Sequence, residues 1–548
     1  MACFVSPQNF LTSFWYYTRI VLTWLWDLIL IYGFPITIYY FFNDVIPYIY
    51  WTCIGCILLT NFMILTEMIV SVYIQTQQKP YHARRLPVDE EDNRQQIPKH
   101  VAVIIAAHLP NEVNTIADPI RHHLAVDLPE GVELDIIVAH NDGHQEQLNQ
   151  LTGIIASIEA ERDDVIVVRN GGNQQQLDQL TTTIASNEAE HDPEKQVRKR
   201  LHNMQVLGSK SKAENINFAL DQMKQWGTSL ADQQRPENDH SVPRSPPEVV
   251  ALFDADAMPH HTNLKRALHT MTLLDADVVQ GRNMVNRGYN FVAIEMDIIY
   301  CIYHPGGQIL RGFGLFGGSN GYWRFDVLDQ IRMDKSMLTE DIDSAMRALR
   351  WGAKVVYDRD VVSKEEAPPS AMDLFKQRLR WAQGWTEVTL RHAFPMVFGS
   401  PLGCCCCALS TRAKRMSWLG RFRLTIQQRI GVFFLLIWRE MFHYISAQVM
   451  PAGIASLVTC ETDTCRETSL IALTIVLFLF PIINSIMSYA LRGPIHKHDI
   501  KPYHYLIYAL ISPGYEWIKY HISVLGHART VFRLTKWRVT KRHAPRSS

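Results

Sequence analysis

Residues 249–256 read VVALFDAD, an apolar run that ends on two carboxylates. Such a run is typical of a buried β-strand. In an extended segment, residues two apart project to the same side, so Asp254 and Asp256 could together hold a hard divalent cation. A cation held there could neutralise a diphosphate. The alternative is a pair of turn residues that cap the next helix, and the D-x-D pattern alone leaves both interpretations open.

Other short runs rich in β-branched residues lie on both sides of this one. They cover residues 100–107, 134–139, 164–169 and 277–280, and helical patterns at 215–226 and 264–274 lie between them. Strands that alternate with helices predict an α/β domain with a mostly parallel sheet, whose ligands bind at the carboxyl ends of the strands. We expect this domain to span residues 95–400. Two polar stretches, about 187–204 and 227–247, are expected to be insertions or mobile loops.

The apolar residues gather at the two ends of the chain, although the averages conceal this. The 548 residues carry 54 Lys+Arg and 54 Asp+Glu, and the mean hydropathy is −0.07. A zero net charge argues against a nucleic-acid partner. Residues 14–42 and 45–74 are each long enough to cross a bilayer, which predicts two transmembrane helices within residues 1–78. Arg19, Asp27 and Glu67 would then have to lie near an interface or pair inside a helix bundle.

The C-terminal region, residues 401–548, contains three further apolar segments, near 430–450, 470–491 and 503–525. The third is interrupted by Ser-Pro-Gly at 512–514 and precedes a basic tail that should stay in the cytoplasm. We therefore expect it to be a re-entrant or hairpin element rather than a full span. Basic residues after the second N-terminal segment place the central domain in the cytoplasm as well. The expected protein is a multi-pass membrane protein of the plasma membrane or Golgi.

Two groups of cysteines stand out in the same region. Cys460 and Cys465 lie in a loop poor in positive charge, close enough to bridge in an oxidising compartment, although their spacing does not show that they do. Residues 404–407 are four consecutive cysteines beside basic residues. Near a membrane helix, this run favours S-acylation over a zinc site, and inert thiols are the other interpretation.

Four more motifs in the central domain each allow a structural and a functional interpretation. Residues 339–341 (TED) are either helix N-terminal acids or include a general base. Residues 377–381 (QRLRW) form one face of a surface helix, or they offer an arginine fork for phosphate and a flat ring for a sugar. Residues 317–321 (GGSNG) are a turn or a loop that lets a ligand approach closely. Lys212 contacts a phosphate or opens a solvated helix.

The order and spacing of D-x-D, T-E-D and Q-x-x-R-W between membrane helices resemble the membrane-embedded family 2 glycosyltransferases, the group that contains cellulose, chitin and hyaluronan synthases. The resemblance covers about residues 100–390, and the flanking helices only in arrangement. It implies a GT-A-type cytoplasmic domain and an inverting, metal-dependent hexosyltransferase. This enzyme would use a nucleotide sugar, with a UDP-sugar as the expected donor, to extend a β-linked polysaccharide and pass it through the membrane. The alternative is transfer of one sugar to a membrane lipid, because enzymes acting on lipids can also carry Q-x-x-R-W.

The resemblance also implies roles for individual residues. Asp341 would be the catalytic base, supported by Glu340. The nucleotide sugar would contact Glu112, Asp142, Lys212, Asn217, Asp254, Gln377, Arg380 and Trp381. The acceptor, a glycan or a lipid, would lie against Gly317, Gly318, Ser319 and Trp381. Asp256 and Asp254 would hold Mg2+ or Mn2+, and membrane lipids would surround the apolar helices.

Two departures from the family pattern leave the base and the sugar of the donor open. Asn141 stands where the first aspartate of a D-D-G triplet is common, and residues 107–110 read AHLP where many relatives have a Pro-x-Tyr type of sequence. Neither the linkage nor the oligomeric state follows from the sequence.

Overall fold

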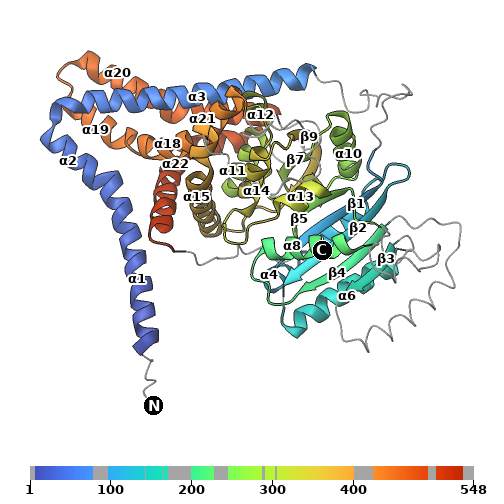
Figure 1. Ribbon diagram of the computed structural model, residues 1–548. Helices are drawn as coiled ribbons and strands as arrows, with labels where there is room; N and C mark the ends of the chain where they lie inside the picture. The colour runs from blue at the N-terminus through green and yellow to red at the C-terminus, as the bar shows by residue number, and fades with distance from the viewer. Residues whose placement is uncertain are drawn as a thin grey trace, which may run out of the picture.

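A computed structural model describes residues 7–77, 97–141, 143–162, 165–170, 199–226, 245–286, 290–302, 305–399, 424–491 and 501–534 (Figure 1). Several features named above lie outside these residues: Asp142, most of the two polar stretches at 187–204 and 227–247, the cysteine run at 404–407 and most of the basic tail. Figure 1 shows an α/β domain beside a group of long helices, with the N-terminal helices in blue and the C-terminal helices in orange and red.

The described residues of the central domain form one sheet of nine strands in the order β3-β4-β2-β1-β5-β8-β7-β9-β6. The strands are β1 (His100–Ala107), β2 (Glu133–Asn141), β3 (Val165–Asn170), β4 (Lys199–Val206), β5 (Val249–Asp254), β6 (Met258–Pro259), β7 (Val278–Val285), β8 (Gly321–Arg324) and β9 (Val355–Glu365). The first five strands in the order pair in parallel, and β8 is antiparallel to both of its neighbours. The predicted α/β fold with a mostly parallel sheet is therefore confirmed.

The helices of the domain cover both faces of this sheet. They are α4 (Leu109–Glu112), α5 (Ala117–Leu124), α6 (Gln145–Glu161), α8 (Lys212–Gln225), α10 (Asn263–Leu273), α11 (Phe291–Ile302), α12 (Pro305–Arg311), α13 (Phe325–Ile331), α14 (Glu340–Arg350) and α15 (Ala371–Phe394). Alternate residues of β1 enter two separate cores: Ile105 packs with α5, α6 and α10, whereas Ile104 packs with α8 and α13. This two-residue alternation is what a strand buried on both faces requires.

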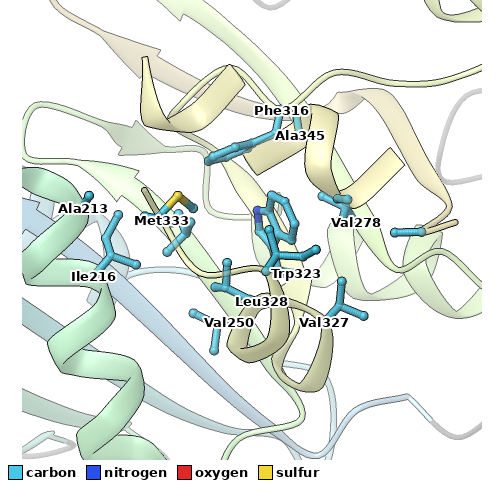
Figure 2. Packing of buried hydrophobic residues seen from close by; sticks show 14 of the residues in the cluster. Ala213, Ile216, Val250, Val278, Phe316, Trp323, Val327, Leu328, Met333 and Ala345 are labelled. Atoms are coloured by element: carbon cyan, nitrogen blue, oxygen red, sulfur yellow. The ribbon is translucent and has the colours of Figure 1, made fainter. Parts of the chain in front are cut away.

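Trp323 of β8 lies at the centre of the second core and is fully buried. Figure 2 shows its ring among Val250 of β5, Val278 of β7 and Leu328 of α13, with Phe316 above it. A buried tryptophan contributes a large apolar area. The core therefore fixes the position of the segment 317–321, which runs directly into β8.

Four of the nine described strands, β4, β6, β8 and β9, were missed by the sequence analysis. Part of the polar stretch at 187–204 was expected to be an insertion or loop, but Lys199–Val206 forms β4, between β2 and β3. The polar residues Arg200 and His202 are buried here because both contact the carboxylate of Asp135 on β2. Their partner is distant in the sequence, so the composition of the stretch concealed a strand.

The remaining helices lie at the two ends of the chain. They are α1 (Pro7–Leu28), α2 (Phe34–Phe41), α3 (Ile46–Gln77), α17 (Ile426–Val432), α18 (Arg439–Ala447), α19 (Val449–Thr459), α20 (Asp463–Thr474), α21 (Phe480–Leu491) and α22 (Pro502–Val531). Among the described residues, four helical stretches are long and apolar enough to cross a membrane: Trp15–Phe41, Ile46–Ile74, Ile426–Thr459 and Asp463–Leu491. These stretches indicate a multi-pass membrane protein.

Two of the costly charges expected in the N-terminal spans are paired inside the helix bundle. Both carboxylate oxygens of Asp27 lie within hydrogen-bonding distance of His521 Nδ1, at 3.1 and 2.9 Å. Glu67 lies 3.7 Å from Arg311 of α12. Pairing of this kind is what makes ionised side chains tolerable in an apolar layer.

The expected re-entrant or hairpin break in the segment 503–525 is wrong. The segment belongs to the continuous helix α22, and Pro513 lies inside it. Proline has no N–H to donate to the carbonyl four residues earlier, which would leave the Ala509 carbonyl unsatisfied. The hydroxyl of Ser512 donates to that carbonyl at 2.9 Å. The local sequence thus repairs the hydrogen bond that Pro513 removes.

The cysteine pair that the sequence left open forms a disulfide. Cys460 and Cys465 are bonded, with their Cα atoms 5.7 Å apart, across the turn that joins α19 to α20. This turn connects two of the candidate spans. A disulfide there fits a loop in an oxidising compartment.

Candidate active site

The candidate residues gather where the parallel strands end. Asp254 is the last residue of β5, and it pairs in register with Ala106 at the end of β1. The loop at 317–321, the first turn of α14 and the middle of α15 approach the same edge of the sheet. Ligands of open α/β sheets bind at this edge, so the position agrees with the sequence expectation.

Lys212 connects two of these elements, β5 and the loop at 317–321, to helix α8. It stands at the start of α8, where the side chain of Ser211 caps the helix by accepting a hydrogen bond from the Glu214 N–H at 3.2 Å. Its ammonium group contacts the carboxylate of Asp254 and donates to the Gly318 carbonyl at 2.6 Å. Burial alone would lower the pKa of Lys212, but the charges of Asp254 and Glu340 outweigh it and raise that pKa. Lys212 is therefore a fixed positive charge.

Asp254 and Asp256 face different partners. The Asp254 side chain is 32% exposed, and its backbone N–H donates to Ser319 Oγ at 3.2 Å. Asp256 is only 2% exposed and accepts a hydrogen bond from the Glu366 N–H at 3.1 Å. Because β5 ends at Asp254, the two residues are not both in an extended strand, as the sequence argument assumed. No cluster of three metal-ligating side chains occurs within the described ranges.

Glu340 and Asp341 occupy the first turn of α14, as the sequence predicted. Burial and the neighbouring Asp341 charge raise the pKa of Glu340 to about 7. Burial also raises the pKa of Asp341, although the Lys212 charge opposes this. The two carboxyls are close enough to titrate as a pair. Such a pair can exchange protons near neutral pH, where ordinary carboxyls cannot.

Gly318 allows the glycine loop to approach Asp341 closely. Its φ is +94°, a backbone conformation that favours glycine. A Cβ atom at this position would lie 2.5 Å from Asp341 Oδ2. Of the two interpretations of the segment 317–321, the geometry therefore favours the close-approach loop.

The Q-x-x-R-W residues lie on α15 but do not all face the same way. Arg380 donates to the Leu338 carbonyl at 3.3 Å, next to the T-E-D turn. Trp381 packs instead toward α11 and α22, and the Arg378 guanidinium lies 4.7 Å from its ring centroid. Gln377 is 7% exposed, and its Oε1 has no hydrogen-bond partner within the described part of the chain. Of the three motif residues, Arg380 thus contacts the segment that leads into the acidic turn, whereas Trp381 faces α11 and α22.

Two of the expected nucleotide contacts have structural partners. Glu112 accepts a hydrogen bond from the His108 N–H at 2.7 Å and so closes the loop after β1. Both amide atoms of Asn217 bond the backbone of Met333, at 2.8 and 3.0 Å. Asn217 therefore links α8 to the segment before α14. Contact of Glu112 and Asn217 with a nucleotide remains a prediction. Asp142, the third expected contact of this kind, lies outside the described residues.

The sequence analysis missed Asn215, a buried residue of α8 that ties two strand ends together. Its amide donates to the carbonyls of Ala107 on β1 and Ala139 on β2, at 3.2 and 3.4 Å, and its Oδ1 accepts from Ser209. These contacts hold the start of α8, and hence Lys212, against the edge of the sheet. Only its place three residues after Lys212 could have pointed to it.

Solved structures with partial likeness to the chain include a mannosyltransferase from Pyrobaculum calidifontis in complex with GDP-Man and Mn2+. It is 12% identical, with a TM-score of 0.44, and the alignment covers 86% of this chain and 98% of that one. S. aureus TarS is also 12% identical, with a TM-score of 0.30 over 78% of this chain and 54% of that one.

Two curated relatives come from Arabidopsis thaliana. A probable glucomannan 4-beta-mannosyltransferase 3 is 30% identical over 154 residues, and a probable glucomannan 4-beta-mannosyltransferase 14 is 27% identical over 157 residues. The aligned segments cover 26% and 27% of this chain. The chain spans only 28% and 29% of the length of these two relatives.

Residues 249–488 match the family model described as glycosyl transferase family group 2. The matched segment begins at β5 and contains Asp254, Asp256, the T-E-D turn of α14 and the Q-x-x-R-W residues of α15. It continues into the C-terminal apolar helices. The family match, the mostly parallel sheet and the apolar helices agree, and the segment 249–488 is that of a family 2 glycosyltransferase.

Proposed function

We propose that the chain is an inverting, processive hexosyltransferase that extends a β-linked polysaccharide from a nucleotide sugar. One observation carries this proposal. The Glu340–Asp341 pair, with its raised pKa values, lies beside the Lys212–Asp254 ion pair at the carboxyl edge of the sheet. A carboxylate that titrates near neutral pH is suited to general base catalysis, and a fixed cation beside it suits an anionic leaving group.

In this mechanism Asp341 accepts the proton of the acceptor hydroxyl. The acceptor oxygen forms a bond to the anomeric carbon while the bond from that carbon to the diphosphate oxygen breaks. Attack from the face opposite the diphosphate inverts an α-linked donor to a β-linked product. Glu340 keeps the pair able to hold a proton near neutral pH, and Lys212 keeps Asp341 ionised by opposing the effect of burial.

Lys212 and Arg380 would hold the leaving diphosphate. Both are cations beside the acidic turn, and Arg380 offers a planar fork that suits phosphate oxygens. Asp254 and Asp256 fit a divalent cation in their donor chemistry, because Mg2+ commonly takes one or two carboxylates together with substrate phosphates. The partial exposure of Asp254 leaves it accessible to such a complex. A bound Mg2+ or Mn2+ would supply positive charge to the diphosphate.

The comparisons support a polysaccharide product without fixing the donor. The two Arabidopsis relatives are described as glucomannan mannosyltransferases, which favours a mannosyl donor for this chain. The sequence resemblance favours a UDP-sugar. The four candidate spans support a route for a growing chain through the membrane, from a catalytic domain in the cytoplasm. Trp381, on the side of α15 that faces α11 and α22, would then carry the acceptor sugar.

The deciding experiment is a donor panel on the purified full chain in lipid nanodiscs. UDP-glucose, UDP-N-acetylglucosamine and GDP-mannose are supplied with Mn2+ or Mg2+, and nucleoside diphosphate release and product size are measured. We expect one donor to give rapid release and a polymer of high molecular mass. A single-sugar lipid product, without a ladder of longer chains, would contradict processivity and favour the lipid alternative. No release from any donor would contradict the proposed activity itself.

A further inference from the structure

The C-terminal helix α22 packs along α15, the helix that carries Arg380 and Trp381. α22 is not among the four candidate spans, yet its polar residues contact several other helices. His521 reaches Asp27 of α1, Tyr508 reaches Glu295 of α11, and its last turns lie along α15. The contact with α15 concerns the candidate active site directly, because it falls within three residues of Arg380.

Gln383 is the residue of α15 at this contact. It is 2% exposed, and both polar atoms of its amide are used. Its Oε1 accepts a hydrogen bond from Arg529 Nε at 3.1 Å, and its Nε2 donates to the Leu534 carbonyl at 2.9 Å. The second bond spans 151 residues of sequence. A buried amide with two satisfied bonds has one favoured orientation, so Gln383 fixes α15 against the end of α22.

The two helices are also unusually close at this point. A Cβ atom on Gly526 of α22 would lie 2.8 Å from the Ala382 Cβ and 2.9 Å from the Gln383 backbone nitrogen. Thr386 Oγ1 lies 3.4 Å from a carboxylate oxygen of Glu440 on α18, on the same side of α15. Ala382, Gln383 and Thr386 therefore form one stripe that faces α22 and α18.

An adjacent stripe of α15 faces the acidic turn. Arg380 donates to the Leu338 carbonyl at 3.3 Å, and Glu387 accepts from the Leu338 N–H at 3.2 Å. Between them, a Cβ on Gly384 would lie 2.4 Å from Thr339 Cγ2. Residues spaced by three or four positions share one face of a helix. Any rotation of α15 about its axis would thus move Arg380 relative to Glu340 and Asp341.

We propose that Arg529 is a positioning residue for sugar transfer: it holds Gln383 and so keeps Arg380 in register with the T-E-D turn. This inference rests on the proposed function. Arg529 is on the C-terminal helix and acts through another side chain. Its effect should appear in turnover more than in donor affinity, because a displacement of about 1 Å at a reacting group can cost roughly 100-fold in rate.

The test is a double-mutant cycle on the full chain in nanodiscs, with Arg529→Ala, Gln383→Ala and the double variant. We expect each single variant to lower kcat by about 10- to 100-fold while the donor KM changes less than about threefold. The double variant should be no worse than either single one, because both remove the same contact. Arg529→Lys should restore part of kcat, since a lysine can donate one hydrogen bond to Gln383. His521→Gln, which breaks a contact of α22 with α1 instead, is the matched control and should keep kcat.

Amide hydrogen exchange of α15 provides a readout that does not depend on activity. Exchange across residues 379–387 should accelerate in Arg529→Ala and in Gln383→Ala, but not in His521→Gln. Unchanged exchange, or losses in kcat that multiply in the double variant, would overturn the proposal. If Arg529→Ala does not fold, Arg529→Gln and Arg529→Lys are compared in the same way. A wild-type chain that releases no nucleoside diphosphate would contradict the proposed function. The hydrogen-exchange measurement would still test whether Arg529 and Gln383 hold α15 in place.

Discussion

Two buried polar clusters lie at opposite ends of the same sheet, and they differ in the number of carboxylates relative to cationic and donor groups. Near the amino ends of the strands, Asp135 of β2 is fully buried. Arg200 donates to both of its oxygens, at 2.7 and 2.9 Å, and His202 and His100 lie 2.6 and 2.5 Å from them. Burial alone would raise the pKa of Asp135, but the hydrogen bonds from Arg200 and the two histidines bring it well below its usual value.

At the carboxyl ends of the strands, carboxylates outnumber the cations. Three carboxylates, those of Asp254, Glu340 and Asp341, surround Lys212. The pKa values of Glu340 and Asp341 are raised, with that of Glu340 near 7. One carboxylate with several donors is a stable structural unit, whereas several carboxylates around one cation are held in a reactive state. The comparison predicts that substitutions at the first cluster change stability and that those at the second change chemistry.

The largest effect is expected from Asp341→Asn. Removal of the proposed base should lower turnover by about 100- to 10,000-fold, the usual range for general base catalysis. The thermal unfolding midpoint should hardly change, because the amide fits the same space. Nucleoside diphosphate release measures the first quantity and differential scanning fluorimetry the second.

Asp343→Asn is the matched control for this substitution, two residues further along α14. Asp343 is fully buried and contacts Arg347 at 2.6 Å and His392 at 2.8 Å, so it resembles the first cluster. We expect this variant to lose stability while the folded fraction keeps its turnover. Equal turnover of wild type and Asp341→Asn would show that the base is assigned to the wrong residue.

Asp135→Asn probes the first cluster. It leaves the buried Arg200 guanidinium without its main counter-charge, and such a loss costs about 3–5 kcal/mol of folding free energy. The unfolding midpoint should fall clearly, whereas kcat of the remaining folded enzyme should stay close to that of wild type. Glu161→Gln, which breaks an exposed pair with Arg121, should leave the midpoint almost unchanged. A large loss of kcat in Asp135→Asn would mean that the two ends of the sheet are not independent.

Gly318→Ala tests how tightly the reactive cluster is packed. The new Cβ would lie 2.5 Å from Asp341 Oδ2, so either the loop or the carboxylate must move. We expect a loss of kcat of roughly 100-fold. Gly131→Ala is the control, because Gly131 also has a positive φ, +72°, but has no atom within 4 Å of a Cβ. If both variants lose the same activity, backbone strain and not contact with Asp341 is responsible.

The sequence revealed the parts of this comparison that depend on local pattern. The run at 249–256 and the T-E-D turn were found because apolar strands and helix N-termini have short-range signatures. β4 was missed because the burial of Arg200 and His202 depends on their hydrogen bonds to Asp135. Asp135 is distant in the sequence, so no local pattern predicts these bonds. The same reason hides Asn215 and Arg529. α22 was misread because Pro513 is a strong local signal, whereas the compensating Ser512 hydrogen bond is a weak one.

The smallest expected effect is on the pH profile, and it tests why the reactive cluster is reactive. Because Glu340 and Asp341 titrate as a pair, the first proton enters as the pH falls through about 7 and is shared with the base, so the wild-type rate should fall there. Glu340→Gln removes a negative charge beside Asp341 while Lys212, Arg380 and Asp254 remain. Asp341 should then stay ionised to lower pH, and the acidic limb of kcat should move down by about one pH unit, or roughly 1.4 kcal/mol. Glu130→Gln, at an exposed turn before β2, should leave the limb in place. An upward shift of the limb would mean that Glu340 lowers the pKa of Asp341 by hydrogen bonding rather than raising it by charge. The difference between the two clusters would then come from geometry instead of from the number of charges.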